Sequence, residues 1–339
     1  MKLTQILGSA SLAALAMTMA GGAQAADKYV VGVSNTLIGN GWREEMICSI
    51  KAEAEASGKV SKVIVANRNG GPSEQIADIR NLISAGANII IINPSDREAL
   101  NPVIKQAADK GIVVVAVDQA VSAPQAYVLA NDQVEYAKLG AKWLFDKLGG
   151  KGSVVEMRGI DGVPADADRH EGFMEVLKSY PDIKVTPVFT GWALDKTAQA
   201  TKDLLASGKA IDGVWTSGID STVVDAYKTA GKPYVPVVGA DNNGFIGQLI
   251  DQKDKGLSGA AVSNPPAVGA AGLSLALDVL AKKDHPHLIK ITPAVWDTDN
   301  GVDQLKAAYN PKLDPMFSVA SVPPYTHYTP EQLISCKGP

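Results

Sequence analysis

The chain contains few of the residues that most often carry catalysis, metal binding or redox chemistry. Its 339 residues include two cysteines and four histidines, and neither a Gly-x-Ser-x-Gly nor a His-Glu-x-x-His motif is present. His285 and His287 flank a proline in a polar stretch, which favours an exposed turn over a metal site. We therefore expect no catalytic residue, no metal and no cofactor.

Neither sign of charge dominates, and no long apolar run follows the first 25 residues. The chain carries 36 acidic and 32 basic side chains, which gives a formal net charge of -4. This mild balance argues against nucleic acid as a partner. A membrane span needs about 20 apolar residues, so we expect no membrane insertion of the mature chain.

The first 25 residues have the pattern of a secretory signal peptide. Lys2 supplies a positive charge, residues 12–20 are apolar except for Thr18, and Ala23-Gln24-Ala25 has the small-x-small form that a signal peptidase cleaves. We predict cleavage near Ala25 and a mature protein in the periplasm. No cysteine lies at this site to carry a lipid anchor.

The two cysteines, Cys48 and Cys336, stand near opposite ends of the chain. Disulfides persist in the oxidising compartment that export implies, so we predict a bond between them. Two buried or free thiols are the alternative, because sequence alone does not bring the pair within bonding distance.

Short β-branched apolar runs alternate with amphipathic stretches of helical length through most of the chain, which is typical of βα units and a parallel sheet. In the first half, strands are predicted at 29–34, 62–67, 87–93, 112–118 and 126–130, and helices at 43–57, 73–85, 97–110 and 133–148. After glycines at 149, 150 and 152, strands are predicted at 153–158, 183–190, 213–217, 235–240 and 257–262, and helices at 169–179, 196–207, 221–230, 244–253 and 266–282. Two such sets predict an α/β fold with two doubly wound parallel-sheet lobes.

Polar and aromatic residues collect where the predicted strands end, which is where sheets of this kind bind ligands. Asn35 and Asn40 follow the first strand, and Asn93, Asp118-Gln119 and Asp241 follow later ones. Each could simply cap a turn or a helix. Trp42 and Trp192, however, fall in strand-end loops as well. Aromatic faces that pack on sugar rings, beside polar groups that bind hydroxyls, are what a sugar pocket needs.

Five short motifs give the chain a resemblance to the periplasmic sugar-binding proteins of the ribose/galactose type, which have a type I two-lobe fold and serve ABC importers. They run in the same order as in that family, through about Pro293. The motifs are Val33-Ser34 leading to Asn40-Gly41-Trp42, then Ile91-Ile92-Asn93-Pro94-Ser95-Asp96, Val117-Asp118, Arg169-His170-Glu171-Gly172-Phe173 and Val238-Gly239-Ala240-Asp241.

The resemblance implies a set of ligand-binding residues. Arg43 stands where relatives have a second aromatic residue, and Gln119 stands where they have an arginine, so ribose itself is not implied. Asp220 matches only with a shift, and the last contact falls on Ser263 or its neighbour Asn264. The full set is Ser34, Asn35, Asn40, Trp42, Arg43, Asn93, Asp118, Gln119, Arg169, Trp192, Asp220, Asp241, Ser263 and Asn264.

The resemblance also implies a division of the chain and a mechanism. After the signal peptide at 1–25, we expect lobe 1 at 26–130 plus 264–294, lobe 2 at 131–263 plus 295–320, and a C-terminal strap at 321–339 that returns to lobe 1. The lobes are joined by a three-segment hinge. A monosaccharide (pentose, hexose or deoxysugar) or a polyol binds between them, the hinge closes, and the membrane permease of an ABC importer receives the ligand. We expect a monomer. A sensory sugar binder that reports to a chemoreceptor or signalling kinase is the alternative, and an exported carbohydrate-active enzyme is the weaker one.

Overall fold

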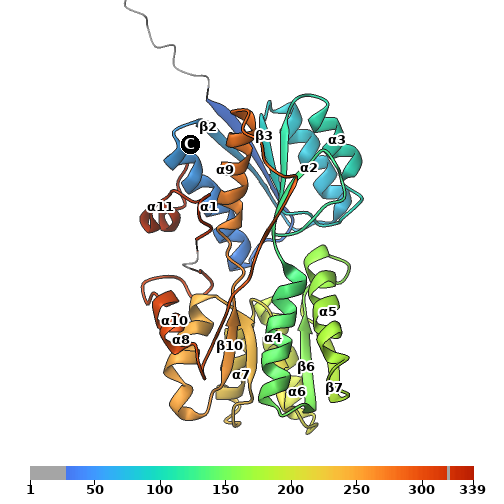
Figure 1. Cartoon of the computed structure of the whole chain (residues 1–339), viewed down its shortest axis with the longest axis vertical. Helices are drawn as coiled ribbons and strands as arrows, with labels where there is room; N and C mark the ends of the chain where they lie inside the picture. Colours follow the sequence, from blue (N-terminus) through green and yellow to red (C-terminus); the bar gives the residue numbers. More distant parts are fainter. Residues whose placement is uncertain (1–27, 319–320) are drawn as a thin grey trace, which may run out of the picture.

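The computed structural model describes residues 28–318 and 321–339, which form two α/β lobes stacked end to end (Figure 1). The predicted signal peptide at 1–25 lies outside the described residues. Within residues 28–318 and 321–339, no helix has the length and apolar character needed to cross a membrane. The predicted fold class is confirmed, and the strands run through the middle of each lobe with helices on both faces.

Lobe 1 is built on a six-stranded sheet in which all neighbouring strands are parallel. Its strand order is β11 (Leu288–Ile291), β5 (Tyr127–Asn131), β4 (Val113–Val117), β3 (Ile89–Ile92), β1 (Tyr29–Asn35) and β2 (Val60–Asn67). Strand β3 consists of four buried isoleucines, as expected for a strand covered on both faces. One face packs against α1 (Gly41–Ser57) and α9 (Val268–Leu280), and the other against α2 (Pro72–Ser84) and α3 (Asn101–Ala108).

Lobe 2 repeats this plan with one strand reversed, because β12 is antiparallel to β10. Its strand order is β12 (Val295–Asp297), β10 (Gly259–Val262), β9 (Val237–Ala240), β8 (Gly213–Trp215), β6 (Lys151–Arg158) and β7 (Asp182–Phe189). One face is covered by α4 (Gln133–Lys147) and α5 (Pro164–Leu177). The other is covered by α6 (Leu194–Ala206), α7 (Asp220–Thr229), α8 (Asn243–Asp251) and α10 (Val302–Ala308), and a 3-10 turn, η1 (Lys253–Lys255), follows α8.

The sequence prediction missed the sixth strand of each sheet, β11 and β12, and the helices α10 and α11 (Pro330–Ser335). It also began the helix at 97–110 too early. The side chain of Asp96 accepts hydrogen bonds from the backbone N–H groups of Glu98 and Ala99, both at 2.7 Å, which forms a turn there. Helix α3 therefore begins only at Asn101.

The chain passes between the two sheets after β5, after β10 and after β11. These crossings are bonded to one another. Asn131 donates a side-chain hydrogen bond to Asn264, and Ser263 and Ala294 exchange two hydrogen bonds of 2.8 Å, one through the Ser263 hydroxyl. The three passages therefore form one connected hinge region.

The C-terminal residues lie on lobe 1. Val322 is part of the core that α1 and α9 share with the sheet, and α11 packs against α1 (Figure 1). The predicted disulfide is present, with a Cys48–Cys336 sulfur–sulfur distance of 2.02 Å. It joins residues 288 positions apart, so the end of the chain is attached covalently to α1.

Candidate ligand-binding site

A cavity with about 420 Å³ of empty space lies between the lobes, at the carboxyl ends of the strands. The lining residues come from both lobes and from one crossing segment. They are Leu37, Asn40, Trp42, Arg43 and Asp118 from lobe 1, Ala165, Arg169, Trp192, Ser217, Gly218 and Ala240 from lobe 2, and Asn264 from the crossing after β10.

The structure brings half of the predicted site residues to the cavity wall. These are Asn40, Trp42, Arg43, Asp118, Arg169, Trp192 and Asn264. The others do not line the cavity: Ser34, Asn35, Asn93, Gln119, Asp220, Asp241 and Ser263. Most of this second group lies one layer behind the wall and holds the wall residues in place.

Arg169, in α5, is fixed by lobe 2. Its Nε donates to the Gln133 side chain at 2.8 Å, and its Nη1 donates to the Ser217 hydroxyl at 3.0 Å. The guanidinium carbon also lies 4.6 Å from the centre of the Tyr136 ring, a cation–π arrangement. The side chain is therefore held before any ligand arrives, which lowers the entropy cost of binding.

Arg43, in the first turn of α1, supplies a second guanidinium from lobe 1. Its Nη1 donates to the Asn35 side chain at 3.1 Å. Burial lowers the pKa of Arg43 to about 10, against the opposing attraction of Asp118, so the group stays charged at neutral pH. The cavity thus holds two guanidinium groups that can donate to ligand oxygens.

Asp118 contributes a carboxylate to the cavity wall, and two side-chain hydrogen bonds fix its orientation. Its Oδ2 accepts from Asn93 at 3.3 Å and its Oδ1 accepts from Gln133 at 2.8 Å. Burial raises the pKa of Asp118, while Arg169 and Arg43 oppose that shift. Gln119 lies behind the wall and links Asn93 to lobe 2. Its side chain donates to Asn93 at 2.5 Å and accepts from the backbone N–H of Ala165 at 2.8 Å.

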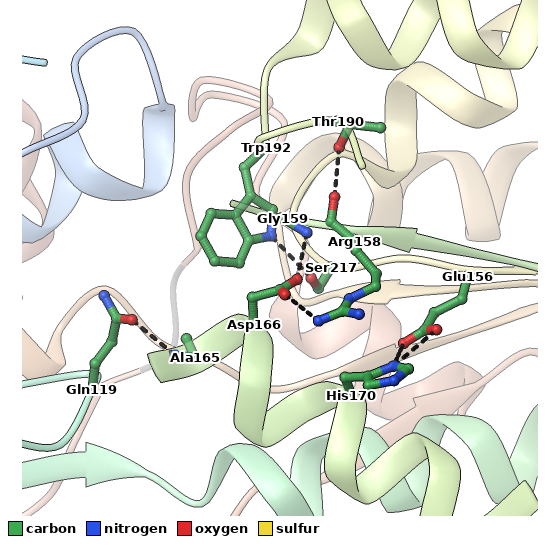
Figure 2. A network of polar contacts seen from close by, with 10 residues as sticks. All are labelled: Gln119, Glu156, Arg158, Gly159, Ala165, Asp166, His170, Thr190, Trp192 and Ser217. Carbon is green, nitrogen blue, oxygen red and sulfur yellow. Dashed lines mark hydrogen bonds and ion pairs between the residues drawn. The ribbon is translucent and has the colours of Figure 1, made fainter. Parts of the chain in front are cut away.

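Trp192 forms the lobe 2 aromatic wall (Figure 2). Its Nε1 donates to the Ser217 hydroxyl at 3.2 Å. Its ring lies so close to Gly159 that a Cβ atom there would be 2.1 Å from the ring carbon Cε2. Asp166 accepts a hydrogen bond of 2.8 Å from the Gly159 backbone N–H and forms an ion pair of 2.5 Å with Arg158, as the dashed lines in Figure 2 show. The Trp192 ring can therefore take this position only because residue 159 is a glycine.

Trp42 is the aromatic residue that lobe 1 contributes to the cavity wall. Its Nε1 donates to the backbone oxygen of Asn264 at 2.6 Å. Asn40 caps α1 by accepting from the Arg43 backbone N–H, and its amide donates to the Trp192 backbone oxygen at 3.3 Å. The Asn40–Trp192 bond joins the two lobes at the cavity, and the Trp42–Asn264 bond ties the wall to the crossing after β10.

The remaining predicted residues lie behind the wall. Ser34 accepts from Gln75 at 3.3 Å, and Ser263 bonds Ala294 in the hinge region. Asp220, at the start of α7, lies against Gly239 of β9 and accepts from Gly218 and Asn242. Asp241 accepts from the Asn264 backbone N–H at 2.9 Å.

Several residues of the wall were not predicted. Ser217 and Gly218 follow β8, and their position after a strand is a signal that could have identified them. Leu37, Ala165 and Ala240 have no polar group and so carried no such signal. Within residues 28–318 and 321–339, no group of three or more His, Cys, Asp or Glu side chains is placed to hold a metal ion.

Two α/β lobes around a polar and aromatic cavity define a two-lobed ligand-binding protein. Residues 31–284 match the family described as "Periplasmic binding protein domain". The chain belongs to this family, whose members are substrate-binding proteins and not enzymes.

Named relatives agree with this assignment. The chain is 33% identical over 246 residues to a xylitol-binding protein of Mycolicibacterium smegmatis, across 69% of this chain and 68% of the relative. It is 27% identical to a ribose import binding protein of Bacillus subtilis, across 76% and 83% of the two chains. A crystal structure of an ABC transporter solute binding protein from Thermobispora bispora superimposes with a TM-score of 0.78 and 32% identity, across 91% of this chain and 94% of that one.

Proposed function

We propose that the chain is the periplasmic substrate-binding component of an ABC sugar importer. It binds a monosaccharide or a polyol between the lobes, closes by hinge movement, and delivers the ligand to a membrane permease. A signal peptide cleaved near Ala25 takes it to the periplasm. The names of the xylitol-binding and ribose import relatives, and of the solute binding protein of known structure, support this role.

The chemistry of the cavity wall is the main support for this proposal. Two guanidinium groups, the Asp118 carboxylate and the amides of Asn40 and Asn264 surround a space that two tryptophans border. Such donors and acceptors match the hydroxyls of a sugar, while the indole rings match its apolar C–H faces. Contacts from both lobes mean that a bound ligand would favour the arrangement in which the lobes meet.

The proposed division of the chain has support from the sheets. Strand β11 joins the first sheet and β12 joins the second, on either side of the crossing at 292–294. We assign residues 26–130 and 264–294 to lobe 1, residues 131–263 and 295–320 to lobe 2, and residues 321–339 to the strap on lobe 1.

A thermal-shift screen of the mature protein against pentoses, hexoses, deoxysugars and polyols tests the proposal. A ligand that binds only the folded state raises the melting temperature in proportion to the logarithm of its concentration. We expect at least one of these compounds to do so. A melting temperature unchanged by every compound would contradict the proposal.

A further inference from the structure

The C-terminal segment, here residues 309–318 and 321–339, contacts first lobe 2 and then lobe 1. Pro315 and Phe317 accept hydrogen bonds of 2.7 Å from the backbone N–H groups of Gly244 and Asn243, at the start of α8. These N–H groups have no partner inside the helix, so the segment satisfies them. From Val322 onward it packs on lobe 1 and ends at the disulfide with Cys48.

Ser318 lies where the contacts of this segment change from one lobe to the other. Its backbone N–H donates to Glu45 Oε2 of α1 at 2.9 Å, and its hydroxyl donates to Asp241 Oδ2 of lobe 2 at 2.9 Å. All three residues are at most 5% exposed. Burial raises the pKa of both carboxyl groups. Ser318 therefore supplies one hydrogen-bond donor to each of two buried carboxyl groups, and a buried carboxyl that loses a donor is destabilised.

A continuous path of hydrogen bonds runs from Ser318 to the cavity wall. The second oxygen of Asp241 accepts from the Asn264 backbone N–H at 2.9 Å. The Asn264 backbone oxygen then accepts from Trp42 Nε1 at 2.6 Å. Asn264 and Trp42 both line the cavity, whereas Asp241 and Ser318 do not.

We propose that Ser318 is a positioning residue of the ligand site, which acts through Asp241 and Asn264 to hold Trp42 and to join the lobes in the arrangement that encloses ligand. The proposal rests on the proposed function for the identity of the ligand. It gives the C-terminal segment a part in binding, although no residue of that segment lines the cavity. A role in folding alone would lower stability and leave the dissociation constant unchanged.

Three variants of the mature protein separate these cases. Ser318→Ala removes the hydroxyl, Ser318→Thr keeps it, and Ser335→Ala makes the same deletion at an exposed position of the segment, where the hydroxyl bonds the backbone of Gln332 and Lys337 within the segment itself. Xylitol and D-ribose serve as probes in calorimetric titrations. Hydrogen exchange of the peptide that contains Asn264 is measured without any sugar.

We expect Ser318→Ala to weaken binding by about tenfold, because Asp241 loses a buried donor. It should also speed exchange of the Asn264 amide. Ser318→Thr and Ser335→Ala should keep both properties near those of the wild type. An unchanged dissociation constant in Ser318→Ala would overturn the proposal. If the wild type binds neither probe nor any compound of the thermal-shift screen, the proposed function fails, and exchange alone decides: faster exchange in Ser318→Ala supports the positioning role, and unchanged exchange overturns it.

Discussion

Asp118 of lobe 1 and Trp192 of lobe 2 both line the cavity, and both have left-handed backbone conformations, with φ of 67° and 55°. At Asp118 the chain makes a γ-turn, since the Gln119 N–H donates to the Val117 oxygen at 2.7 Å. Such conformations are costly for non-glycine residues and are concentrated at functional sites. Each lobe thus has one cavity-lining residue in a strained backbone conformation.

The position of the Trp192 ring should depend on Gly159. In Gly159→Ala the new Cβ would lie 2.1 Å from the ring, so the indole must move out of the cavity wall. We expect ligand affinity to fall by at least about tenfold, since the ring lines the cavity in which we propose that the ligand binds. Calorimetric titration measures the change.

Gly71→Ala is the matched control for that variant, because the added Cβ makes only an ordinary contact, 3.6 Å from Glu74, at the start of α2 in lobe 1. Its affinity should equal that of the wild type. Equal affinities for Gly159→Ala and Gly71→Ala would show that the Trp192 ring does not contribute to binding.

Removal of the disulfide should destabilise the protein. Cys48→Ser with Cys336→Ser frees the end of a chain that packs on α1, and loss of a native disulfide typically costs about 2–5 kcal/mol. Thermal unfolding, followed by circular dichroism, should show a melting temperature lower by several degrees. Treatment of the wild type with a reductant should reproduce this shift. A melting temperature that neither change affects would indicate that the bond contributes nothing to stability.

Asp220 should make stability depend on pH. Burial raises its pKa to about 7, and the unfolded value is about 3.9. Between these values the folded protein holds a proton that the unfolded chain has lost, so the free energy of unfolding falls as pH rises from about 4 to about 7. The contribution is constant above that range.

Asp220→Asn cannot titrate and isolates this contribution from those of the other buried carboxyl groups. Urea unfolding of both proteins at about pH 5 and about pH 8 gives the comparison. We expect the wild type to lose more stability than the variant over this range. Parallel losses would contradict the raised pKa of Asp220.

Much of the fold is predictable because it follows from continuous apolar runs such as the isoleucines at 89–92, which only a doubly covered strand buries. Strand β11 lacks that signal, since its Leu-Ile-Lys-Ile sequence is partly exposed. Strand β12 has three residues, and its pairing with β10 brings together parts of the chain that are distant in sequence. Neither strand has a local pattern that could reveal it.

The sequence predicts that the site lies at the strand ends. It does not predict which strand-end residues line the cavity and which lie behind the wall. Asn93 and Asp118 both follow central strands, yet Asp118 lines the cavity while Asn93 lies behind and orients it. At Asp118 the chain turns, and Gln133 of lobe 2 donates to its carboxylate. A contact between lobes has no local pattern in the sequence. The contacts of Ser318 are even less predictable from the sequence, because its partners Glu45 and Asp241 are 273 and 77 positions away in the chain.

We propose that a sugar or polyol binds between the lobes and is held by Arg169. Calorimetric titration of the wild type and of Arg169→Lys, with the compound that gives the largest thermal shift, measures the contribution of Arg169 to binding. Lysine keeps the charge but loses the fork that bonds Gln133 and Ser217 and can grip neighbouring hydroxyls. We predict one ligand per wild-type chain and affinity at least about tenfold weaker in the variant. Equal affinities would show that Arg169 does not hold the ligand, and no binding by the wild type would show that the cavity is not a sugar site.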